Sequence, residues 1–243
     1  MTEDSRARAA ATEPAGGTLY VVATPIGNRD DITLRALRIL GSVCLVAAED
    51  TRRTGMLLRH HGIRARLVSY YSHNRFRRLG ELMEALGRGE SVALVTDAGT
   101  PGISDPGGVL VARALEGGYG VVPVPGPCAA VAALSASGLP ADSFLYLGFL
   151  SSKRGRRRRQ LGELAASSTT VIIYEAPHRI AETVADMLEL FGPERTVCIA
   201  RELTKRFEEA LRGPLGDVAE RVSAREPKGE YTIIIAPAEG THT

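Results

Sequence analysis

Short apolar runs that end in turn-forming residues recur along this chain and limit the folds open to it. Continuous apolar runs of this kind are typical of strands buried on both faces, as in parallel sheets covered by helices. The runs are at residues 18–23, 43–48, 91–96, 120–124, 144–149, 170–174, 196–200 and 231–236. The sequence therefore predicts an α/β protein with a largely parallel, helix-covered sheet.

Helical periodicity fills gaps between these runs. In two gaps, apolar residues recur at intervals of three or four, so that they share one face of a helix. The first set is Phe76, Leu79, Leu82, Met83 and Leu86, and the second is Ile180, Val184, Met187, Leu188 and Phe191. Each set predicts an amphipathic helix that covers a sheet.

The length of 243 residues, of which 44% are hydrophobic, suits one large domain or two of ordinary size. The small-residue segment at residues 132–140 separates the two sets of apolar runs. We therefore expect two α/β domains, at residues 18–131 and 132–240. Residues 1–17 contain charged residues and proline but no apolar core, so we expect a disordered N-terminal arm rather than a secretory signal.

Composition argues against several classes of protein. No apolar run approaches the length of about 18 residues that a membrane span needs. The three cysteines, Cys44, Cys128 and Cys198, are far apart and form no CxxC pair, which argues against a disulfide framework or a zinc site. These features predict a cytoplasmic protein without a bound metal. The net charge of +2 says little about nucleic acid.

Glycine and proline gather where predicted strands end. Three such segments are TPIGN (24–28), DAGTPGISDPG (97–107) and PGPCA (125–129), and the polar segment EDTR (49–52) follows another predicted strand. Ligands of open α/β sheets bind outside the carboxyl ends of the strands, and glycine lets main chain approach a ligand closely. A tight surface turn would explain one such cluster, but three after sequential strands favour a binding site. The sequence contains no GxGxxG after a strand and no GxxxxGK[ST], HExxH or GxSxG motif.

These segments, followed by YEAPHR (174–179), RELTKRFEE (201–209) and KGEYTIII (228–235), carry a resemblance. In this order they resemble the tetrapyrrole-methylase-like (class III) S-adenosylmethionine methyltransferases. Within that family they are similar to the bacterial enzymes that methylate the 2′-oxygen of a cytidine in 16S rRNA. The resemblance covers residues 18–237 and rests most specifically on DAGTPGISDPG, YEAPHR and RELTK.

The resemblance implies that S-adenosylmethionine binds in a cleft between two α/β domains, commonly in a homodimer. Carried over by motif, the cofactor-binding residues are Ile26, Gly27, Ala98, Gly99, Thr100, Ile103, Cys128, Ala129, Glu175 and Leu203. Cys128 replaces the serine usual in the family, and Ser151 and Ser152 replace a turn that usually contains proline. Many relatives continue into a further helical segment after the motif that corresponds to KGEYTIIIAP. We therefore carry over no RNA or dimer contact from that segment.

Transfer of a methyl group to a ribose hydroxyl calls for a base or a charge-stabilising group near the oxygen. His73 has the most suitable unperturbed pKa, although a histidine in such a turn is more often a hydrogen-bonded loop residue. Asp50 is a second candidate, but an acid at this position can equally cap the following helix. Arg52 could steer phosphate or be solvated. These three residues are the catalytic candidates.

Together with the resemblance, a run of cations predicts contact with 16S rRNA of the small ribosomal subunit. Like charges this dense repel one another unless a polyanion is near, although such runs are often only solvated faces. The predicted RNA-binding residues are Lys153, Arg154, Arg156, Arg157, Arg158, Arg159 and Arg179. Only three of the 30 basic residues are lysine, which fits phosphate binding by arginine and fits a GC-rich coding sequence equally well.

The resemblance therefore implies S-adenosylmethionine-dependent 2′-O-methylation of a cytidine ribose in 16S rRNA. With no tryptophan and 5% aromatic residues, the chain is poorly equipped to hold a flipped base, whereas a ribose hydroxyl needs no deep stacking pocket. One alternative is a methyltransferase that acts on a tetrapyrrole or a modified protein histidine. A second is a non-catalytic RNA-binding assembly factor that keeps the same fold.

Overall fold

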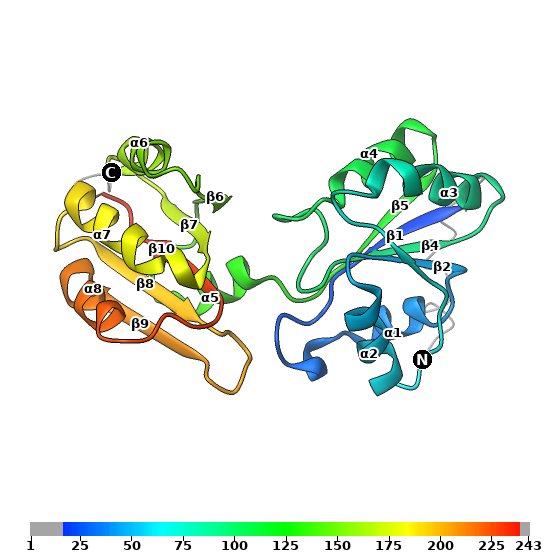
Figure 1. The fold of residues 1–243 in the computed structure, drawn as a ribbon, viewed down its shortest axis with the longest axis horizontal. Helices are drawn as coiled ribbons and strands as arrows, with labels where there is room; N and C mark the ends of the chain where they lie inside the picture. Colours follow the sequence, from blue (N-terminus) through cyan, green and yellow to red (C-terminus); the bar gives the residue numbers. More distant parts are fainter. Residues whose placement is uncertain (1–16, 239–243) are drawn as a thin grey trace, which may run out of the picture. The chain divides into compact units, whose positions relative to one another are not determined.

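The computed structural model describes residues 17–238, which divide into two compact units (Figure 1). Within these residues, the first unit comprises residues 17–24 and Asp30–Gly126, and the second comprises Pro25–Arg29 and residues 127–238. Most of the expected N-terminal arm, residues 1–16, lies outside the described residues. Gly17 belongs to the first unit instead, because it is buried and its N–H donates to the Leu86 carbonyl at 2.9 Å.

The first unit is built on a parallel five-stranded sheet of order β3-β2-β4-β1-β5. The strands are β1 (Thr18–Val22), β2 (Leu45–Ala48), β3 (Leu67–Ser69), β4 (Val92–Val95) and β5 (Gly120–Val124). Every residue of β2 and of β4 is buried, as the continuous apolar runs predict. The predicted parallel sheet is therefore confirmed in this unit, with β3 as an additional strand.

Helices cover both faces of this sheet. They are α1 (Leu34–Leu40), α2 (Thr51–His60), α3 (Arg75–Gly87) and α4 (Gly108–Glu116). Leu82 of α3 and Leu110 of α4 share one buried cluster with Leu45. Leu40 of α1 and Leu58 of α2 share the other with Val46, the next residue of β2. Successive strand residues point to opposite faces, so one strand supplies both cores.

The second unit has a mixed sheet of order β6-β7-β10-β8-β9. Its strands are β6 (Phe144–Phe149), β7 (Thr170–Glu175), β8 (Thr196–Arg201), β9 (Glu209–Pro214) and β10 (Tyr231–Ile235). Only β6 and β7 pair in parallel, so the expectation of a largely parallel sheet is wrong here. Only residues 202–208 join β8 to β9, and a parallel pair would need a crossover of about a dozen residues or more.

Helices also cover both faces of the second sheet. They are α5 (Ala129–Ser137), α6 (Arg154–Leu164), α7 (Ile180–Phe191), which follows the short 3₁₀ helix η2 (Pro177–Arg179), and α8 (Leu215–Ser223). Helices α6, α7 and α8 share one buried cluster with the sheet, and α5 shares the other. The expected domain boundary after residue 131 falls inside α5. Because α5 packs on the second sheet, the units divide between Gly126 and Pro127.

Among residues 17–238, no helix is long and apolar enough to cross a membrane, and no group of three or more His, Cys, Asp or Glu side chains is placed to hold a metal ion.

Candidate active site

Main-chain hydrogen bonds join the ends of β1 and β4 in the first unit. The N–H of Thr24 donates to the Gly99 carbonyl at 2.9 Å, and the N–H of Gly99 donates back to the Thr24 carbonyl at 3.0 Å. The Thr24 hydroxyl donates to the Thr96 carbonyl at 3.0 Å. The loops that follow both strands are thereby fixed to each other at the carboxyl edge of the sheet, where open α/β sheets bind ligands.

Acidic side chains connect this edge to β2. Glu49 Oε2 accepts a hydrogen bond from the Thr96 hydroxyl at 2.9 Å. Asp97 Oδ1 accepts from the Asp50 N–H at 2.9 Å, and Asp97 Oδ2 lies 3.3 Å from Arg53 Nη1. Glu49 and Asp97 therefore hold the main chain of two neighbouring loops in place.

The long glycine-rich loop after β4 is shaped by Asp105 and by glycines. One oxygen of Asp105 accepts hydrogen bonds from the N–H groups of Gly102 at 2.6 Å and Gly107 at 2.7 Å. Gly99 has φ of 85°, which glycine adopts without strain. Of the predicted cofactor-binding residues, Ala98 and Ile103 are exposed, while Gly99 is buried and Thr100 is half-buried. The loop thus carries the exposed side chains of Ala98 and Ile103 on a hydrogen-bonded frame.

Gly27 and Leu203, which are 176 residues apart in sequence, come together in the second unit. A Cβ atom at Gly27 would lie 2.9 Å from the Leu203 carbonyl oxygen, 2.7 Å from Thr204 Oγ1 and 2.5 Å from Lys205 Cγ. The neighbouring Asn28 N–H donates to Thr204 Oγ1 at 3.0 Å. The turn TPIGN therefore packs against the RELTK segment, and only glycine fits at the point of contact.

Glu175 is buried, and its carboxylate is satisfied by the chain itself. Oε1 accepts hydrogen bonds from the Ala176 N–H and from Arg179 Nε, each at 2.8 Å, and Oε2 accepts from the Thr183 hydroxyl at 2.6 Å. Arg179 also donates to the Leu150 carbonyl at 3.3 Å. These contacts fix η2 and the start of α7, and the cofactor contact predicted for Glu175 and the RNA contact predicted for Arg179 stay predictions.

Cys128 and Ala129 form the start of α5 in the second unit. Cys128 occupies the N-cap position, and its side chain makes no capping hydrogen bond. The Ala130 N–H instead donates to the Tyr174 hydroxyl oxygen at 3.0 Å. Burial raises the pKa of Tyr174, so its hydroxyl stays protonated. Tyr174 of the YEAPHR motif therefore holds the start of α5, a role that the sequence alone did not reveal.

Asp50 caps helix α2. Its Oδ1 accepts hydrogen bonds from the Arg52 N–H at 2.8 Å and from Arg52 Nε at 3.3 Å. The hydrogen bond from the Arg52 side chain is the main cause that lowers the pKa of Asp50 to about 2. A carboxylate with this pKa is a weak base near neutrality. The capping alternative therefore describes Asp50 better than the catalytic one, and the pair that Arg52 makes with it is exposed to solvent.

His73 is exposed in the turn between β3 and α3. Its ring lies 6.1 Å from that of Tyr71, in an edge-to-face arrangement. Strands β2 and β3 are parallel neighbours, and Ala48 pairs with Ser69 at their carboxyl ends. His73 and Arg52 therefore follow adjacent strands at the sheet edge that also carries residues 97–107. The catalytic role of His73 stays a prediction.

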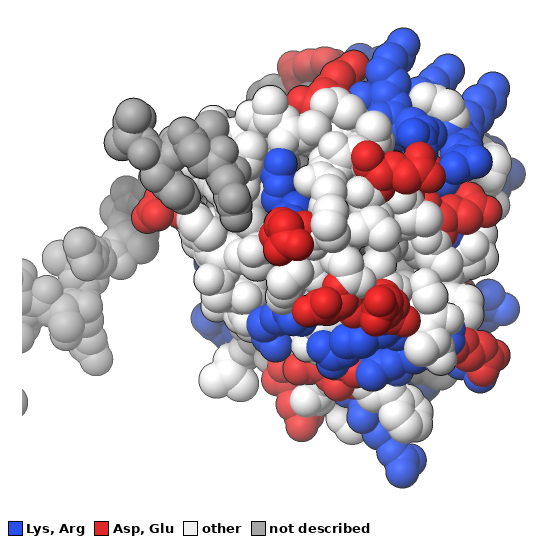
Figure 2. Space-filling view, turned by 90° about the vertical axis from the view of Figure 1, so that its left-hand side faces the viewer, with Lys and Arg blue, Asp and Glu red and all other residues white. Residues whose placement is uncertain are grey.

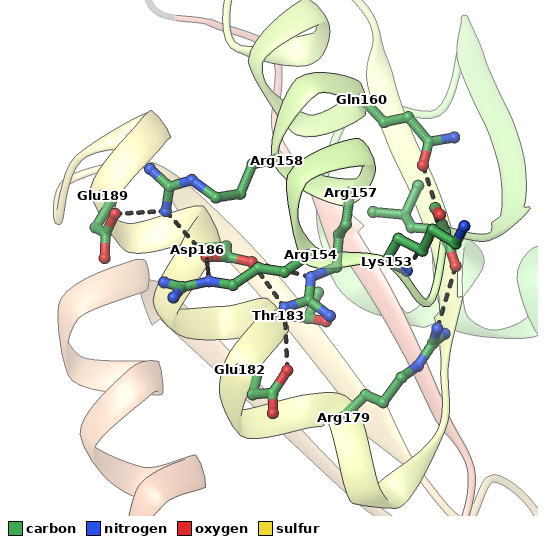
Figure 3. A network of polar contacts seen from close by, with 12 residues as sticks. Lys153, Arg154, Arg157, Arg158, Gln160, Arg179, Glu182, Thr183, Asp186 and Glu189 are labelled. Carbon is green, nitrogen blue, oxygen red and sulfur yellow. Dashed lines mark hydrogen bonds and ion pairs between the residues drawn. The ribbon is translucent and has the colours of Figure 1, made fainter.

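The predicted RNA-binding run at the start of helix α6 divides into cations that join a polar network with α7 (Figure 3) and cations that lie outside it. Arg157 is only 1% exposed and lies between Asp186, 2.8 Å away, and Glu182, 3.2 Å away. Arg154 and Arg158 also pair with Asp186, at 3.3 and 3.0 Å. Arg157, Leu161 and Leu164 are the buried residues of α6, at helical spacing. The predicted RNA contact of Arg157 is therefore wrong, because its side chain is part of the core.

The cations of this run that remain free of the Asp186 network are Lys153, Arg156 and Arg159, and all three are exposed. Arg159 makes one loose pair with Glu163 at 3.9 Å. Figure 2 shows the side of the protein that lies at the left in Figure 1. Basic side chains gather near the upper right of this view, with acidic side chains beside them. The basic surface of α6 is thus smaller than the sequence predicts and partly neutralised.

Comparisons with known proteins agree with one another on the family. A family model described as tetrapyrrole (corrin/porphyrin) methylases matches residues 18–219. Ribosomal RNA small subunit methyltransferase I of Synechocystis is 49% identical over 222 residues, which are 91% of this chain and 80% of that protein. The protein of the same name from Mesorhizobium japonicum is 50% identical over 228 residues, 93% of this chain and 76% of that protein.

Solved structures share the fold at much lower sequence identity. Uroporphyrin-III C-methyltransferase from Thermus thermophilus has a TM-score of 0.64 and 23% identity, with 92% of this chain and 96% of that chain covered. The structure of that enzyme complexed with S-adenosyl homocysteine has a TM-score of 0.63 and 22% identity, with 90% and 97% covered.

Proposed function

Because this chain belongs to the family of tetrapyrrole (corrin/porphyrin) methylases, we propose that it is an S-adenosylmethionine-dependent methyltransferase that acts on ribosomal RNA of the small subunit. The proposed substrate rests on sequence identity to proteins named ribosomal RNA small subunit methyltransferase I. About half of the residues are identical, over about nine tenths of this chain. The tetrapyrrole alternative has weaker support, since uroporphyrin-III C-methyltransferase is only 23% identical. The finer proposal is 2′-O-methylation of a cytidine ribose in 16S rRNA.

The residues present suit such a cofactor, which combines a carboxylate, a cation and an apolar adenosine. In the first unit, the proposed contacts come from Ala98, Gly99, Thr100 and Ile103, on a loop whose main chain is held by Asp105. In the second unit, they come from Ile26, Gly27, Leu203 and the start of α5 at Cys128 and Ala129. The lack of room for a Cβ at Gly27 lets the TPIGN turn pack closely against the segment that carries Leu203.

When bound, S-adenosylmethionine supplies a methyl group on a positively charged sulfur. Methyl transfer to O2′ forms a carbon–oxygen bond, breaks the carbon–sulfur bond and releases the hydroxyl proton. The chain must align the hydroxyl with the methyl carbon, and the rigid loops at the edge of the first sheet suit that task. We propose His73 as the side chain that accepts the proton, since the pKa of Asp50 is too low for this role.

A homodimer in the cytoplasm is a further part of the proposal. Edge strand β6 exposes apolar side chains of Phe144, Leu145, Leu147 and Phe149, with exposed fractions between 40% and 54%. Exposed apolar patches mark interaction surfaces. Sedimentation equilibrium measures the state directly, and a mass of one chain at micromolar concentration would contradict the dimer.

The enzymatic proposal is tested by incubating the protein with methyl-labelled S-adenosylmethionine and undermethylated small ribosomal subunits. We expect the label to enter 16S rRNA and not ribosomal protein. A subunit that binds the protein but gains no label would favour the alternative of a non-catalytic assembly factor. In a parallel incubation with uroporphyrinogen, label in the tetrapyrrole and none in the RNA would favour the tetrapyrrole alternative.

Cofactor binding predicts a thermal shift. A ligand that binds only the folded state, present at about 100 times its Kd, adds about 2.7 kcal/mol to the free energy of unfolding. For a chain of this size that corresponds to a rise of roughly 5–10 °C in the melting temperature. We expect this rise with S-adenosylmethionine and with S-adenosylhomocysteine, measured by scanning fluorimetry. An unchanged melting temperature at millimolar concentrations of both ligands would contradict cofactor binding.

A further inference from the structure

The most basic part of this chain is not the run on α6 but residues 51–80 of the first unit. This stretch contains eight of the 30 basic residues and three histidines, and none of the 28 acidic ones. The rest of the chain therefore has more acidic than basic residues, although the net charge is only +2. A GC-rich coding sequence explains arginine in place of lysine, but it does not explain the absence of acids.

Two groups of these arginines begin helices at one edge of the first sheet. Arg52 and Arg53 lie in the first turn of α2, which follows β2, and Arg75, Arg77 and Arg78 lie in the first turn of α3, which follows β3. Since β2 and β3 are parallel neighbours, both helices start from the carboxyl edge. Residues 97–107 and His73 leave the sheet from this edge too, so the arginines flank the proposed reaction site.

The first turn of α3 lacks the anions that would balance it. Arg78 pairs with Glu81 at 2.8 Å, but within residues 17–238 no carboxylate lies at ion-pairing distance from Arg75 or Arg77. The Nε atom of Arg75 is buried without a hydrogen-bond partner. Cations are also unfavourable at a helix N-terminus, where the helix dipole is positive, and Asn74 provides no side-chain cap. A bound phosphate would satisfy these groups together.

An aromatic side chain stands among these cations. Phe76 is 72% exposed, and the guanidinium carbon of Arg75 lies 4.9 Å from the centre of its ring. Tyr71, in the preceding turn, is 39% exposed and contacts the ring of His73. A second such pair, Phe207 with Arg206, lies between β8 and β9 of the second unit, whereas Phe76 stands at the carboxyl edge of the first sheet. Such pairs of ring and cation are the elements with which proteins bind single-stranded nucleic acid.

We propose that the first turn of α3 binds a single-stranded segment of the substrate RNA, with one base stacked on Phe76 and adjacent phosphates on Arg75 and Arg77. The proposal rests on the function proposed above and adds where the RNA strand docks. A single strand is favoured over a duplex, because the bases of a duplex are stacked on each other and leave no face free for the ring. An acidic peptide would use the arginines but would gain little from an exposed phenylalanine.

Binding of a fluorescent single-stranded oligoribonucleotide of about 12 nucleotides tests the proposal. We expect Phe76→Ala to raise Kd by about 5- to 100-fold and Phe76→Trp to restore binding, since every aromatic ring can stack. We expect Arg77→Ala to reduce the slope of log Kd against log salt by about 0.7, the contribution of one phosphate on a single strand. Leu115→Ala, which alters a side chain 60% exposed near the end of α4, is the matched control and should bind as the wild type does.

Methyl transfer to small subunits separates this inference from the proposed function. We expect Phe76→Ala to raise KM for subunits with little change in kcat, while cofactor affinity measured by calorimetry stays at the wild-type value. If Phe76→Ala and Arg77→Ala both bind RNA as the wild type does and still transfer methyl groups, the proposed docking surface is wrong. The proposed methyltransferase function would be unaffected by that result. An equal loss of affinity for single-stranded and duplex RNA would overturn the stacking role of Phe76. A wild-type protein that binds the oligoribonucleotide but transfers no methyl group would contradict the proposed function alone.

Discussion

Arg157→Ala will lower the free energy of unfolding by about 3–5 kcal/mol, the cost of breaking a buried ion pair from one side. Arg157 and Asp186 each have a side chain only 1% exposed, and they lie 2.8 Å apart. Removing the guanidinium leaves the carboxylate buried with only the partial support of Arg154 and Arg158. Urea denaturation, followed by circular dichroism, measures the change.

The neighbouring Arg156→Ala is the matched control. Arg156 is exposed on the same helix, so we expect a change within about 0.5 kcal/mol. For RNA affinity we expect the reverse order of effects. Arg156→Ala should bind RNA more weakly, whereas the folded fraction of Arg157→Ala should bind as the wild type does. Equal stability of the two variants would contradict the buried network.

The same network makes stability depend on pH. Burial opposes ionisation of Asp186, but hydrogen bonds from Arg157, Arg158 and Arg154 outweigh it, so that the pKa of Asp186 is lowered. A lowered pKa means that the contribution of this carboxylate to stability is present above the pKa of the unfolded chain and is lost as the pH falls through the folded value. Comparing the wild type with Asp186→Asn across acidic pH isolates this contribution, since the variant lacks the titrating group.

Gly27→Val will reduce methyl transfer by roughly 100-fold or more, because a displacement of about 1 Å at a reaction site costs that much. A Cβ atom at Gly27 would lie 2.5 Å from Lys205 Cγ and 2.9 Å from the Leu203 carbonyl oxygen, well inside van der Waals contact. The TPIGN turn and the RELTK segment must therefore separate. We expect a comparable loss of cofactor affinity, measured by calorimetry.

Gly162→Ala is the control for this substitution. A Cβ at Gly162, which lies on α6, would meet nothing within 4 Å, and alanine is favoured over glycine in a helix. We expect normal activity and equal or greater stability. Gly27→Val with wild-type cofactor affinity would show that this turn lies outside the binding site.

The sequence predicted the strands that form continuous apolar runs, and it missed the two that do not. Strand β3 has only three residues, too few to show a pattern. Strand β9 alternates between buried, half-buried and exposed positions, without the continuous apolar run that marks a buried strand. Because β9 was not predicted, the short connection between β8 and β9 could not be recognised. The antiparallel pairing that this connection requires was therefore missed as well.

The charged residues were harder to place than the strands. Charge alone predicts one basic surface on α6, yet the spacing of Arg157, Leu161 and Leu164 places Arg157 on the buried face. Its partner Asp186 is on another helix, 29 residues away, and only the tertiary structure brings the two together. The acid-free stretch at residues 51–80 was visible in the sequence, but apolar residues interrupt it, so it does not stand out as a run.

Locating the methyl group on the modified nucleotide tests the central claim most directly. Undermethylated small subunits are treated with the protein and S-adenosylmethionine, and the RNA is then divided for nucleoside mass spectrometry and for alkaline hydrolysis. The account predicts a cytidine whose added mass stays with the sugar and whose 3′ phosphodiester resists alkali, because hydrolysis requires a free 2′-hydroxyl. A modified nucleoside whose added mass stays with the base, and whose phosphodiester is cleaved, would contradict it.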